Sequence, residues 1–395
     1  TLTDTTLTMG SENTTLTANY EANKYTVTFN ANSGKVTTSN KSVTYADKYG
    51  TLPVPTRDGY EFLGWFTSAT SGTQIKEDTT VAITANQTLY AHWKQLTKLS
   101  QYLINNYKAL GLTSISQTAT GNQNYATTEY RYQGKTPNNY ITFNNEKGVW
   151  RIIGVFEVET PNSSGTYTKE KKVKIVRESI GSLVWNSTNT TNYNDWSTST
   201  LMTLLNSGDY YKRSGSYSSN GLTTDAKNKI TSTKWYMGNI TYASFSGFLT
   251  TSSVYSDERT DAMNGNDTLW SGKIGLIYPS DYMYASSSCY NDSTKSGYDQ
   301  NGSSPYTTDY RNTSCTNTNW LFSSSLSYWS ITSPFSESFP GSWTRVNSVF
   351  IQNSGSLYYA NVSSTSNGVR PTLYLDANAI YKSGSGTTSN PFIIE

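Results

Sequence analysis

Residues able to do nucleophilic or metal chemistry are few in this chain, and they restrict what it could catalyse. It contains one histidine, His92, and two cysteines, Cys289 and Cys315. A Ser–His–Asp or Cys–His site needs an imidazole beside its nucleophile, and His92 lies in a predicted β-strand where we expect a structural role. Two cysteines are too few to build a zinc or iron–sulfur site from thiolates. The sequence therefore predicts no catalytic residue, no metal and no cofactor.

The two cysteines are expected to form a disulfide. They flank a segment rich in Ser, Asn, Gly and Tyr, which has few other means of becoming ordered. The Ser-, Thr- and Asn-rich composition is typical of secreted proteins, in which disulfides persist.

Carboxylates offer the remaining route to catalysis, because a pair of them can hydrolyse a glycosidic bond. Asp257, Glu258 and Asp261 lie beside Arg259, a pattern that we interpret as an ion-pair cluster in a surface loop. Asp292 and Asp299 lie in a polar segment that we expect to be solvated rather than to bind calcium. Since the fold decides which carboxylates meet, a glycan-active hydrolase remains the alternative to a binding protein.

Composition favours a β-rich, α+β protein. Of the 395 residues 35% are hydrophobic and only 15% charged, with 32 tyrosines and 10 tryptophans. Ser, Thr and Asn favour strands, turns and caps over helix interiors. The net charge of +2 gives no electrostatic reason to expect nucleic acid as a partner. Without an apolar run of about 20 residues, this fragment is not expected to insert into a membrane.

Residues 25–94 form a predicted strand-rich module. Asp78-Thr-Thr-Val-Ala-Ile83 near its end resembles Asp4-Thr-Thr-Leu-Thr-Met9. A period of about 70 residues indicates a tandem array, so residues 1–23 are interpreted as the tail of a preceding copy. Further repeats are expected upstream.

Three motifs carry a family resemblance in this module. They are Val27-Thr-Phe-Asn-Ala-Asn-Ser-Gly34, Arg57-Asp-Gly-Tyr-Glu-Phe-Leu-Gly-Trp65 and Leu89-Tyr-Ala-His-Trp93. The module resembles the internalin-type B repeat, also called the Listeria–Bacteroides repeat. The resemblance implies a small β-grasp-like domain that forms stalks on bacterial surface proteins. We expect Phe29, Tyr45, Phe62, Trp65, Leu89 and Trp93 to form its core.

The rest of the chain is predicted to contain one larger domain. We predict an amphipathic helix over 96–111, followed by a polar linker that runs to residue 139. Residues 140–395 form the predicted head. Within the head we predict strands at 148–156 and 172–176, and short helices at 196–205 and 224–230. The stretch 270–282 is predicted to be a buried strand that leads into a loop, and 343–362 a β-hairpin.

The head carries a second resemblance. Its motifs are Trp150-Arg-Ile-Ile-Gly154, Gly272-Lys-Ile-Gly-Leu276 with Tyr278-Pro-Ser-Asp-Tyr282, Asn319-Trp-Leu321, Trp329-Ser-Ile-Thr-Ser-Pro334 and Gly368-Val-Arg-Pro371. They resemble a domain of uncharacterised function in Firmicutes surface proteins. Its ending is similar to C-type-lectin-like folds of the formylglycine-generating-enzyme and retroelement-diversified kinds. This sequence has neither the close pair of copper-binding cysteines of formylglycine-generating enzymes nor the calcium-binding residue triplets of sugar-binding C-type lectins.

The resemblance implies a ligand-binding surface between the Trp329 motif and the final Gly368 motif. Large aromatic, arginine and amide side chains there could grip a sugar or a protein loop. The predicted ligand-binding residues are Phe335, Glu337, Phe339, Trp343, Arg345, Tyr358, Tyr359 and Asn361.

The predicted domain order is a repeat tail at 1–23, a B repeat at 24–95, a helix and polar linker at 96–139, and a C-type-lectin-like head at 140–395. We interpret the chain as a fragment of a bacterial cell-surface adhesin, extracellular and not an enzyme. Its expected partner is an extracellular protein or glycan. The alternatives are the hydrolase and a structural tip without a specific ligand.

Overall fold

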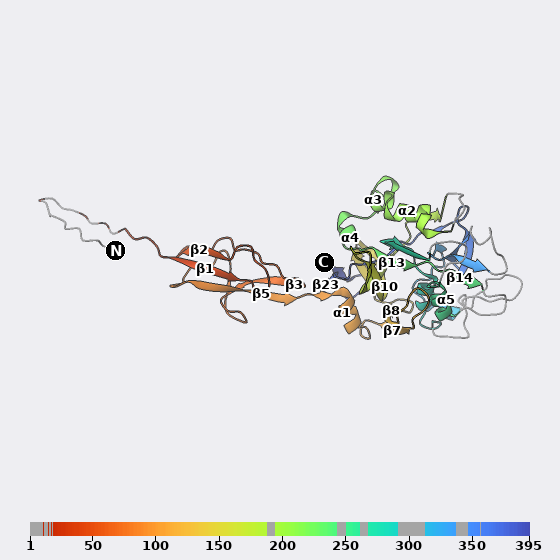
Figure 1. Cartoon of the computed structure of the whole chain (residues 1–395), viewed down its shortest axis with the longest axis horizontal. Helices are drawn as coiled ribbons and strands as arrows, with labels where there is room; N and C mark the ends of the chain where they lie inside the picture. Colours follow the sequence, from red (N-terminus) through yellow and green to blue (C-terminus); the bar gives the residue numbers. More distant parts are fainter. Residues whose placement is uncertain are drawn as a thin grey trace. The chain divides into compact units, whose positions relative to one another are not determined.

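The computed structural model describes residues 11, 15, 17, 19–187, 194–242, 250–260, 268–290, 313–336, 347–355 and 357–395. The chain divides into two compact units, Thr1–Leu96 and Thr97–Glu395 (Figure 1). Strands dominate both units, and helices in the second are short, so the expected β-rich α+β class is confirmed. The predicted repeat tail at 1–23 lies mostly outside the described residues.

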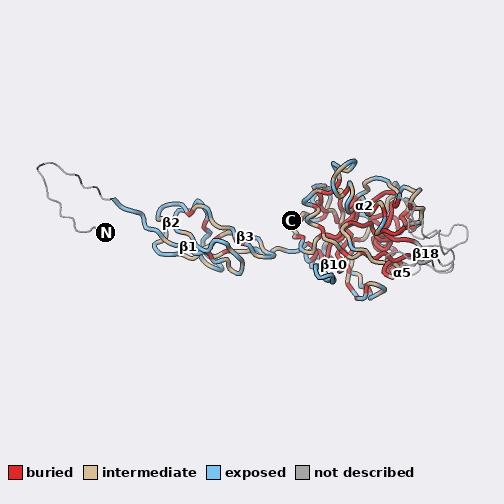
Figure 2. The backbone as a smooth tube through the Cα atoms, turned by 45° about the horizontal axis from the view of Figure 1, so that its top comes forward, coloured by how far each residue is buried: buried red, intermediate tan, exposed pale blue. Residues whose placement is uncertain are grey.

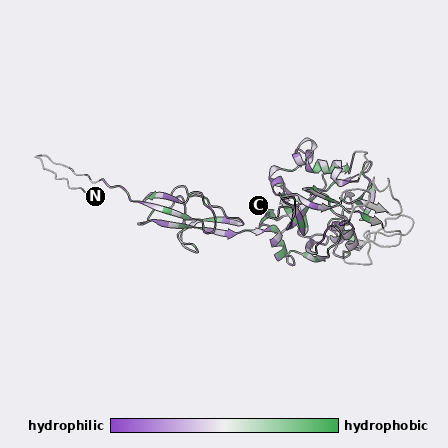
Figure 3. Ribbon diagram, in the orientation of Figure 1, coloured by the Kyte–Doolittle hydropathy of each residue, from purple (hydrophilic) through white to green (hydrophobic). Residues whose placement is uncertain are grey.

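The first unit is one mixed sheet of five strands in the order β2-β1-β5-β3-β4. The central pair, β1 and β5, is parallel, and the other pairs are antiparallel. Alternating polar and apolar residues along these strands give the sheet one buried face (Figure 3). The strands are β1 Lys24–Asn30, β2 Asn40–Thr44, β3 Tyr60–Phe66, β4 Gln74–Ile75 and β5 Gln87–Gln95.

Trp65 lies at the centre of this unit's core. It is 1% exposed, its ring lies 4.9 Å from that of Phe29, and its indole N–H donates to the carbonyl of Pro53 at 2.7 Å. Trp93 is only partly buried and lies close to Gly34, where a Cβ atom would come within 2.6 Å of the indole ring. Tyr45, expected in the core, is 46% exposed, because β2 ends at Thr44 and the strand alternation stops there.

We predict that Trp65→Ala destabilises the repeat by about 3–5 kcal/mol, because it leaves a cavity in a close-packed core. Denaturant unfolding of a fragment spanning residues 19–96, followed by circular dichroism, measures the loss. Tyr45→Ala, the exposed control, should change the free energy of unfolding by less than about 0.5 kcal/mol. Equal effects of the two substitutions would contradict this account of the core.

The second unit, here called the head, is built on a seven-stranded sheet. Its order is β16-β22-β11-β10-β8-β7, with β9 paired to β10. The long hairpin of β10 and β11 forms its centre. The strands are β7 Leu112–Gln117, β8 Thr127–Tyr132, β9 Tyr140–Phe143, β10 Glu146–Pro161, β11 Tyr167–Arg177, β16 Ile274–Gly275 and β22 Thr372–Tyr374.

A second sheet in the head has five strands in the order β12-β21-β17-β19-β20. Two smaller pairs accompany it, β13 with β15 and β14 with β18. These strands are β12 Ser182–Val184, β13 Thr233–Tyr236, β14 Ile240–Tyr242, β15 Leu269–Gly272, β17 Tyr328–Trp329, β18 Pro334–Ser336, β19 Asn347–Ile351, β20 Leu357–Asn361 and β21 Ser366–Gly368.

Short helices fill the connections of the head, and several begin at a side-chain cap. Ser199 accepts a hydrogen bond from the Met202 amide at the start of α2, and Thr223 accepts one from Ala226 at α4. The helical segments are α1 Leu99–Asn105, η1 Trp196–Thr198, α2 Thr200–Asn206, α3 Asp209–Lys212, η2 Gly215–Tyr217, α4 Thr224–Asn228, α5 Thr251–Asp257, α6 Pro279–Tyr284 and α7 Thr313–Thr316.

The expected helix over 96–111 is present in part as α1, but residues 97–139 are not a linker, because they belong to the same compact unit as residues 140–395. Strand β6, Thr97–Lys98, pairs with β23, Ile380–Ser383, which also pairs with β24, Ile393–Ile394. Leu99 and Leu103 of α1 are fully buried in the head core. The strands β7 and β8 extend the large sheet, so the polar segment between helix and head is itself sheet.

Much of the head's chain is buried (Figure 2), and its interior is rich in tryptophan. Trp185, Trp235 and Trp329 are fully buried, and each indole N–H donates to a backbone carbonyl of a different segment. Trp329 donates to Leu183, which ties β17 to β12 across the second sheet. Each tryptophan thus contributes apolar area and also fixes one element against another.

Charged side chains lie beneath the large sheet, and Asp281 of α6 is their centre. One of its carboxylate oxygens accepts from Arg131 at 2.9 Å and the other from Lys174 at 2.6 Å. Arg131 also donates to Glu129 at 2.8 Å. These side chains are at most 3% exposed. The two cations hold the pKa of Asp281 below its usual value although burial opposes this.

Glu258 and Arg259, expected in a surface loop, are buried beside this network. Glu258 accepts from the backbone N–H of Ser280 at 2.8 Å, and Arg259 donates to Gln123 at 2.8 Å. The expected ion pair is present, with Arg259 3.3 Å from Glu258, but the surface location was wrong because the partners that make burial possible lie far away in the sequence. The stretch 279–284, expected to be a loop, is helix α6, and Asp281 caps it by accepting from the Tyr278 amide.

Burial raises the pKa of Glu258 to about 7, although the positive charge of Arg259 and the hydrogen bonds from Ser280 act to lower it. Between pH 4.5 and 7 the folded head therefore binds a proton that the unfolded chain has released, so the free energy of unfolding falls as pH rises through this window. Glu258→Gln should flatten this fall, which amounts to a few kcal/mol at about 1.4 kcal/mol per pKa unit.

Denaturant unfolding between pH 4.5 and 7 tests this expectation. Asp225→Asn, which removes an exposed carboxylate paired with Lys229, serves as the control and should leave the slope unchanged. The lowered pKa values of Asp281 and Glu146 act at more acid pH, where their stabilisation is lost as pH falls. A parent protein whose stability rises across the window would contradict the assignment.

Candidate functional site

Four of the predicted ligand-binding residues lie outside the described residues, namely Glu337, Phe339, Trp343 and Arg345. The backbone of Phe335 belongs to β18 and pairs with Thr241 of β14. Tyr358, Tyr359 and Asn361 lie on β20, in the predicted hairpin with β19. The assignment of these residues to a binding surface stays a prediction.

The described part of this surface is a pair of stacked tyrosines. The rings of Tyr358 and Tyr359 lie 5.1 Å apart and 4° from parallel, and both residues are half-buried. Tyr358 also meets the ring of Phe350 edge-on at 5.8 Å. Asn361 stabilises the turn after β20, because its side-chain oxygen accepts hydrogen bonds from the amides of Ser363 and Ser364.

A rigid layer supports these tyrosines. In β19, Val349 and Ile351 are fully buried, and the neighbouring β17 contributes Trp329, also fully buried. Val369, which follows β21, is fully buried too. Among the described strands, β20 is the last of its sheet and pairs with β19. The aromatic pair therefore lies at a sheet edge with a packed core behind it.

The expected disulfide is present in the structure. Cys289 and Cys315 are joined with their Cα atoms 5.5 Å apart, and both are buried. Residues 291–312 of the enclosed segment, including Asp292 and Asp299, lie outside the described residues. Among the described residues no group of His, Cys, Asp and Glu is arranged to hold a metal ion.

We predict that protein that has never been reduced shows no thiol when titrated under denaturing, non-reducing conditions. Replacing both cysteines by serine should lower the free energy of unfolding of the head by roughly 3 kcal/mol, because the unfolded chain regains the entropy of an open loop. Two titratable thiols in freshly purified protein would refute the pairing.

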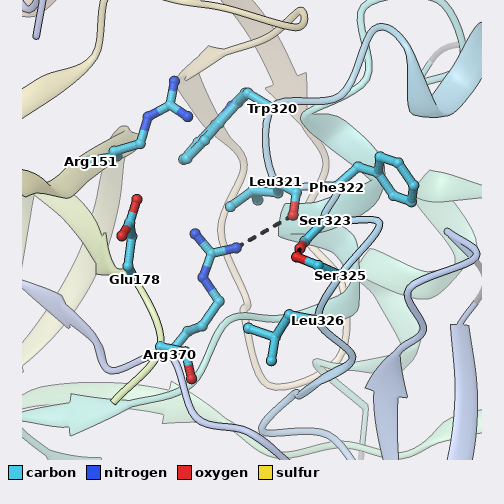
Figure 4. A pocket seen from close by; sticks show the side chains of 10 residues that line it. Arg151, Glu178, Trp320, Leu321, Phe322, Ser323, Ser325, Leu326 and Arg370 are labelled. Atoms are coloured by element: carbon cyan, nitrogen blue, oxygen red, sulfur yellow. Dashed lines mark hydrogen bonds between the residues drawn. The ribbon is translucent and has the colours of Figure 1, made fainter. Parts of the chain in front are cut away.

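A cleft of about 410 Å³ opens on another part of the head (Figure 4). Three motifs quoted for the head's resemblance meet there, contributing Arg151, Trp320 and Arg370. Sequence reasoning missed this cleft as a site because it used those motifs as evidence of fold alone. The lining residues are Arg151, Glu178, Ser179, Trp320, Leu321, Phe322, Ser323, Ser325, Leu326 and Arg370.

Arg151 projects from β10 and is held by neighbouring groups. Its guanidinium donates to Asn139 at 2.8 Å and to the carbonyl of Pro137 at 3.3 Å. It lies over the ring of Trp320 at 4.4 Å and over that of Tyr140 at 4.6 Å. Burial, helped by the charge of Arg370, lowers the pKa of Arg151 to about 10, so the group stays charged at neutral pH.

Arg370 reaches the same cleft from the segment after β21 and is 8% exposed. It donates through Nε to the carbonyl of Arg177 at 3.2 Å and through Nη1 to that of Leu321 at 3.4 Å. Its guanidinium carbon lies 5.0 Å from the centre of the Tyr328 ring. These contacts fix the planar guanidinium in one orientation.

Glu178 is the one carboxylate among the described residues of the lining, and its side chain turns toward the same open space as the two arginines (Figure 4). Ser323 and Ser325 stand on the opposite side, with their hydroxyl oxygens 3.3 Å apart. Glu258, the carboxylate whose pKa is raised to about 7, is fully buried and takes no part in this lining. The cleft thus combines two cations, one anion, hydroxyls and aromatic rings.

Comparison with known families agrees with the first unit of the fold. Residues 25–92 match the model of the Listeria–Bacteroides repeat domain. This repeat is typical of extracellular bacterial surface proteins. A search of curated proteins finds no match to the chain. Among the described residues no helix is long and apolar enough to cross a membrane.

In the Listeria–Bacteroides repeat, His92 has the structural role expected from the sequence pattern. Its Nε2 lies 2.9 Å from the carbonyl oxygen of Ser68, and its ring stacks on Phe66 at 3.9 Å. Both contacts lie within the repeat's own sheet and adjoining turn.

Proposed function

We propose that the chain is part of a bacterial cell-surface adhesin in which the repeat presents the head to an extracellular protein or glycan. The match of residues 25–92 to a surface-protein repeat supports the location. The disulfide between Cys289 and Cys315 supports it independently, because such bonds persist in oxidising compartments. The proposal includes further repeats upstream and the C-type-lectin-like character that the head's motifs predict.

The observation that carries the binding role is the stacked pair Tyr358 and Tyr359 on β20, the last of the described strands in its sheet. Tyrosine offers a large contact area and a hydroxyl while losing few rotatable bonds. Because β19 and β17 behind the pair are fully packed, little conformational entropy remains to be lost when a ligand binds. Trp343 and Arg345, just before β19 in the sequence, are the further contacts that we propose.

Binding by the hairpin predicts a specific loss on truncation. A head carrying Trp343→Ala, Arg345→Ala and Tyr358→Ala together should lose at least about 2 kcal/mol of binding free energy, the cost of removing a central contact. The probes are immobilised glycans and extracellular host proteins, first screened with the parent chain. Affinity for each hit is then measured by surface plasmon resonance.

The matched control is Tyr167→Ala, which removes a tyrosine at the start of β11 that is 44% exposed. It should bind as tightly as the parent. Melting temperatures of both variants within a few degrees of the parent would show that the fold is retained. If the folded triple variant binds every hit as tightly as the parent, the hairpin is not the contact surface.

A further inference from the structure

Of the cleft's two arginines, Arg370 is buried and Arg151 is half-buried, and among the described residues neither has the ionic partner that the head's fully buried cations have. Arg131 and Lys174 are paired with Asp281, and Arg259 with Glu258. Among the described residues, neither Arg151 nor Arg370 lies within ion-pair distance of a carboxylate. A buried charge without a counterion is costly, and an anion in the cleft would remove that cost.

Each of these arginines also keeps donors available. The contacts of Arg151 use Nε and Nη2, and those of Arg370 use Nε and Nη1. Within the described part of the chain no acceptor engages Nη1 of Arg151, and Arg370, which has five N–H groups, keeps at least two of them beyond its contacts with the Arg177 carbonyl, the Leu321 carbonyl and Tyr328. Because the stacking on Trp320 and the bonds to backbone carbonyls fix both planes, these N–H groups are already positioned for a ligand oxygen.

We propose that this cleft binds an acidic sugar, with the sugar's carboxylate between Arg151 and Arg370. Glu178 leaves a net charge of +1 among the three ionised groups, which suits a carboxylate better than a phosphate dianion. The carboxylate of Glu178 and the hydroxyls of Ser323 and Ser325 match the hydroxyl groups of a sugar ring.

The size and polarity of the cleft favour a sugar over an apolar ligand. A volume of about 410 Å³ holds a ligand of one or two sugar rings. Phe322 and Leu326 supply the limited apolar surface that the C–H groups of a ring need. The cleft is distinct from the β19–β20 hairpin, so the two proposed sites can be tested independently.

Titration of the unmodified chain tests the ligand class directly. Calorimetry with D-glucuronate, D-glucose, N-acetylglycine and inorganic phosphate separates the contributions of carboxylate and ring. D-Glucuronate should bind at least about tenfold more tightly than the other three, the difference expected when a charge-assisted bidentate contact is added to ring contacts. Equal or tighter binding of D-glucose, N-acetylglycine or phosphate would overturn the proposal.

Variants then locate the site. Arg151→Gln should weaken D-glucuronate binding about tenfold or more, whereas Lys147→Gln, which removes an exposed positive charge outside the cleft, should change it less than about twofold. Equal effects of the two would overturn the assignment. Since Arg151 also stacks on Trp320, near-ultraviolet circular dichroism checks its fold.

Glu178→Gln provides a second variant, because no described side chain makes a hydrogen bond or ion pair with the Glu178 carboxylate, whereas Arg177 donates only to its backbone carbonyl. Removing its negative charge should strengthen phosphate binding by at least about threefold, since the repulsion of a dianion is relieved. Unchanged phosphate binding would place the anion away from Glu178 and contradict the geometry. Tyr358→Ala should leave D-glucuronate binding unchanged, which distinguishes this site from the hairpin.

Discussion

The carboxylate of Asp281 joins the large sheet of the head to helix α6, and much of the head's architecture depends on this contact. Arg131 projects from β8 and Lys174 from β11, the two strands that flank β10. Two cations buried on one face of a sheet would repel each other strongly without an anion between them. Asp281 supplies that anion and also caps α6 through the Tyr278 amide, so the helix can pack in one position on the sheet.

The surrounding side chains make this burial tolerable. Arg131 lies between the rings of Phe156 and Tyr284, each 4.6 Å from its guanidinium carbon. Lys174 lies 4.2 Å from the centre of the Tyr278 ring. Aromatic faces attract a cation and exclude water, so the charges interact in a medium of low polarity. The many tyrosines of this composition are therefore partly explained by the head's buried charges rather than by its surface.

The sequence predicted those features that depend on local patterns. Alternation and turn residues place the strands of the repeat, and short helices were expected over 196–205 and 224–230, because each signal involves residues a few positions apart. The pairing of Cys289 with Cys315 followed from composition and compartment. Tyr45 was misplaced because a strand's alternation gives no information on where the strand ends.

The features that could not be predicted depend on contacts between distant segments. Glu258 and Arg259 resemble a surface cluster until Ser280 and Gln123 are brought to them. The cleft likewise requires β10, the loop around Trp320 and the segment after β21 to meet. A composition count records each arginine but not whether a carboxylate lies within reach.

The head contains two kinds of arginine that are shielded from solvent, and the difference between them supports the proposed role of the cleft. Arg131 and Arg259 satisfy their charge inside the protein, and this satisfaction holds the fold together. Arg151 and Arg370 satisfy only part of their donor capacity, through carbonyl and amide oxygens that orient the side chain without neutralising it. An arrangement that fixes a charge and leaves it unneutralised contributes little to folding stability, because the desolvation cost is not recovered internally. An anion that enters the cleft offsets this desolvation cost. Because Trp320 and Tyr328 hold the two guanidinium groups in fixed orientations, the cleft is selective for a planar carboxylate.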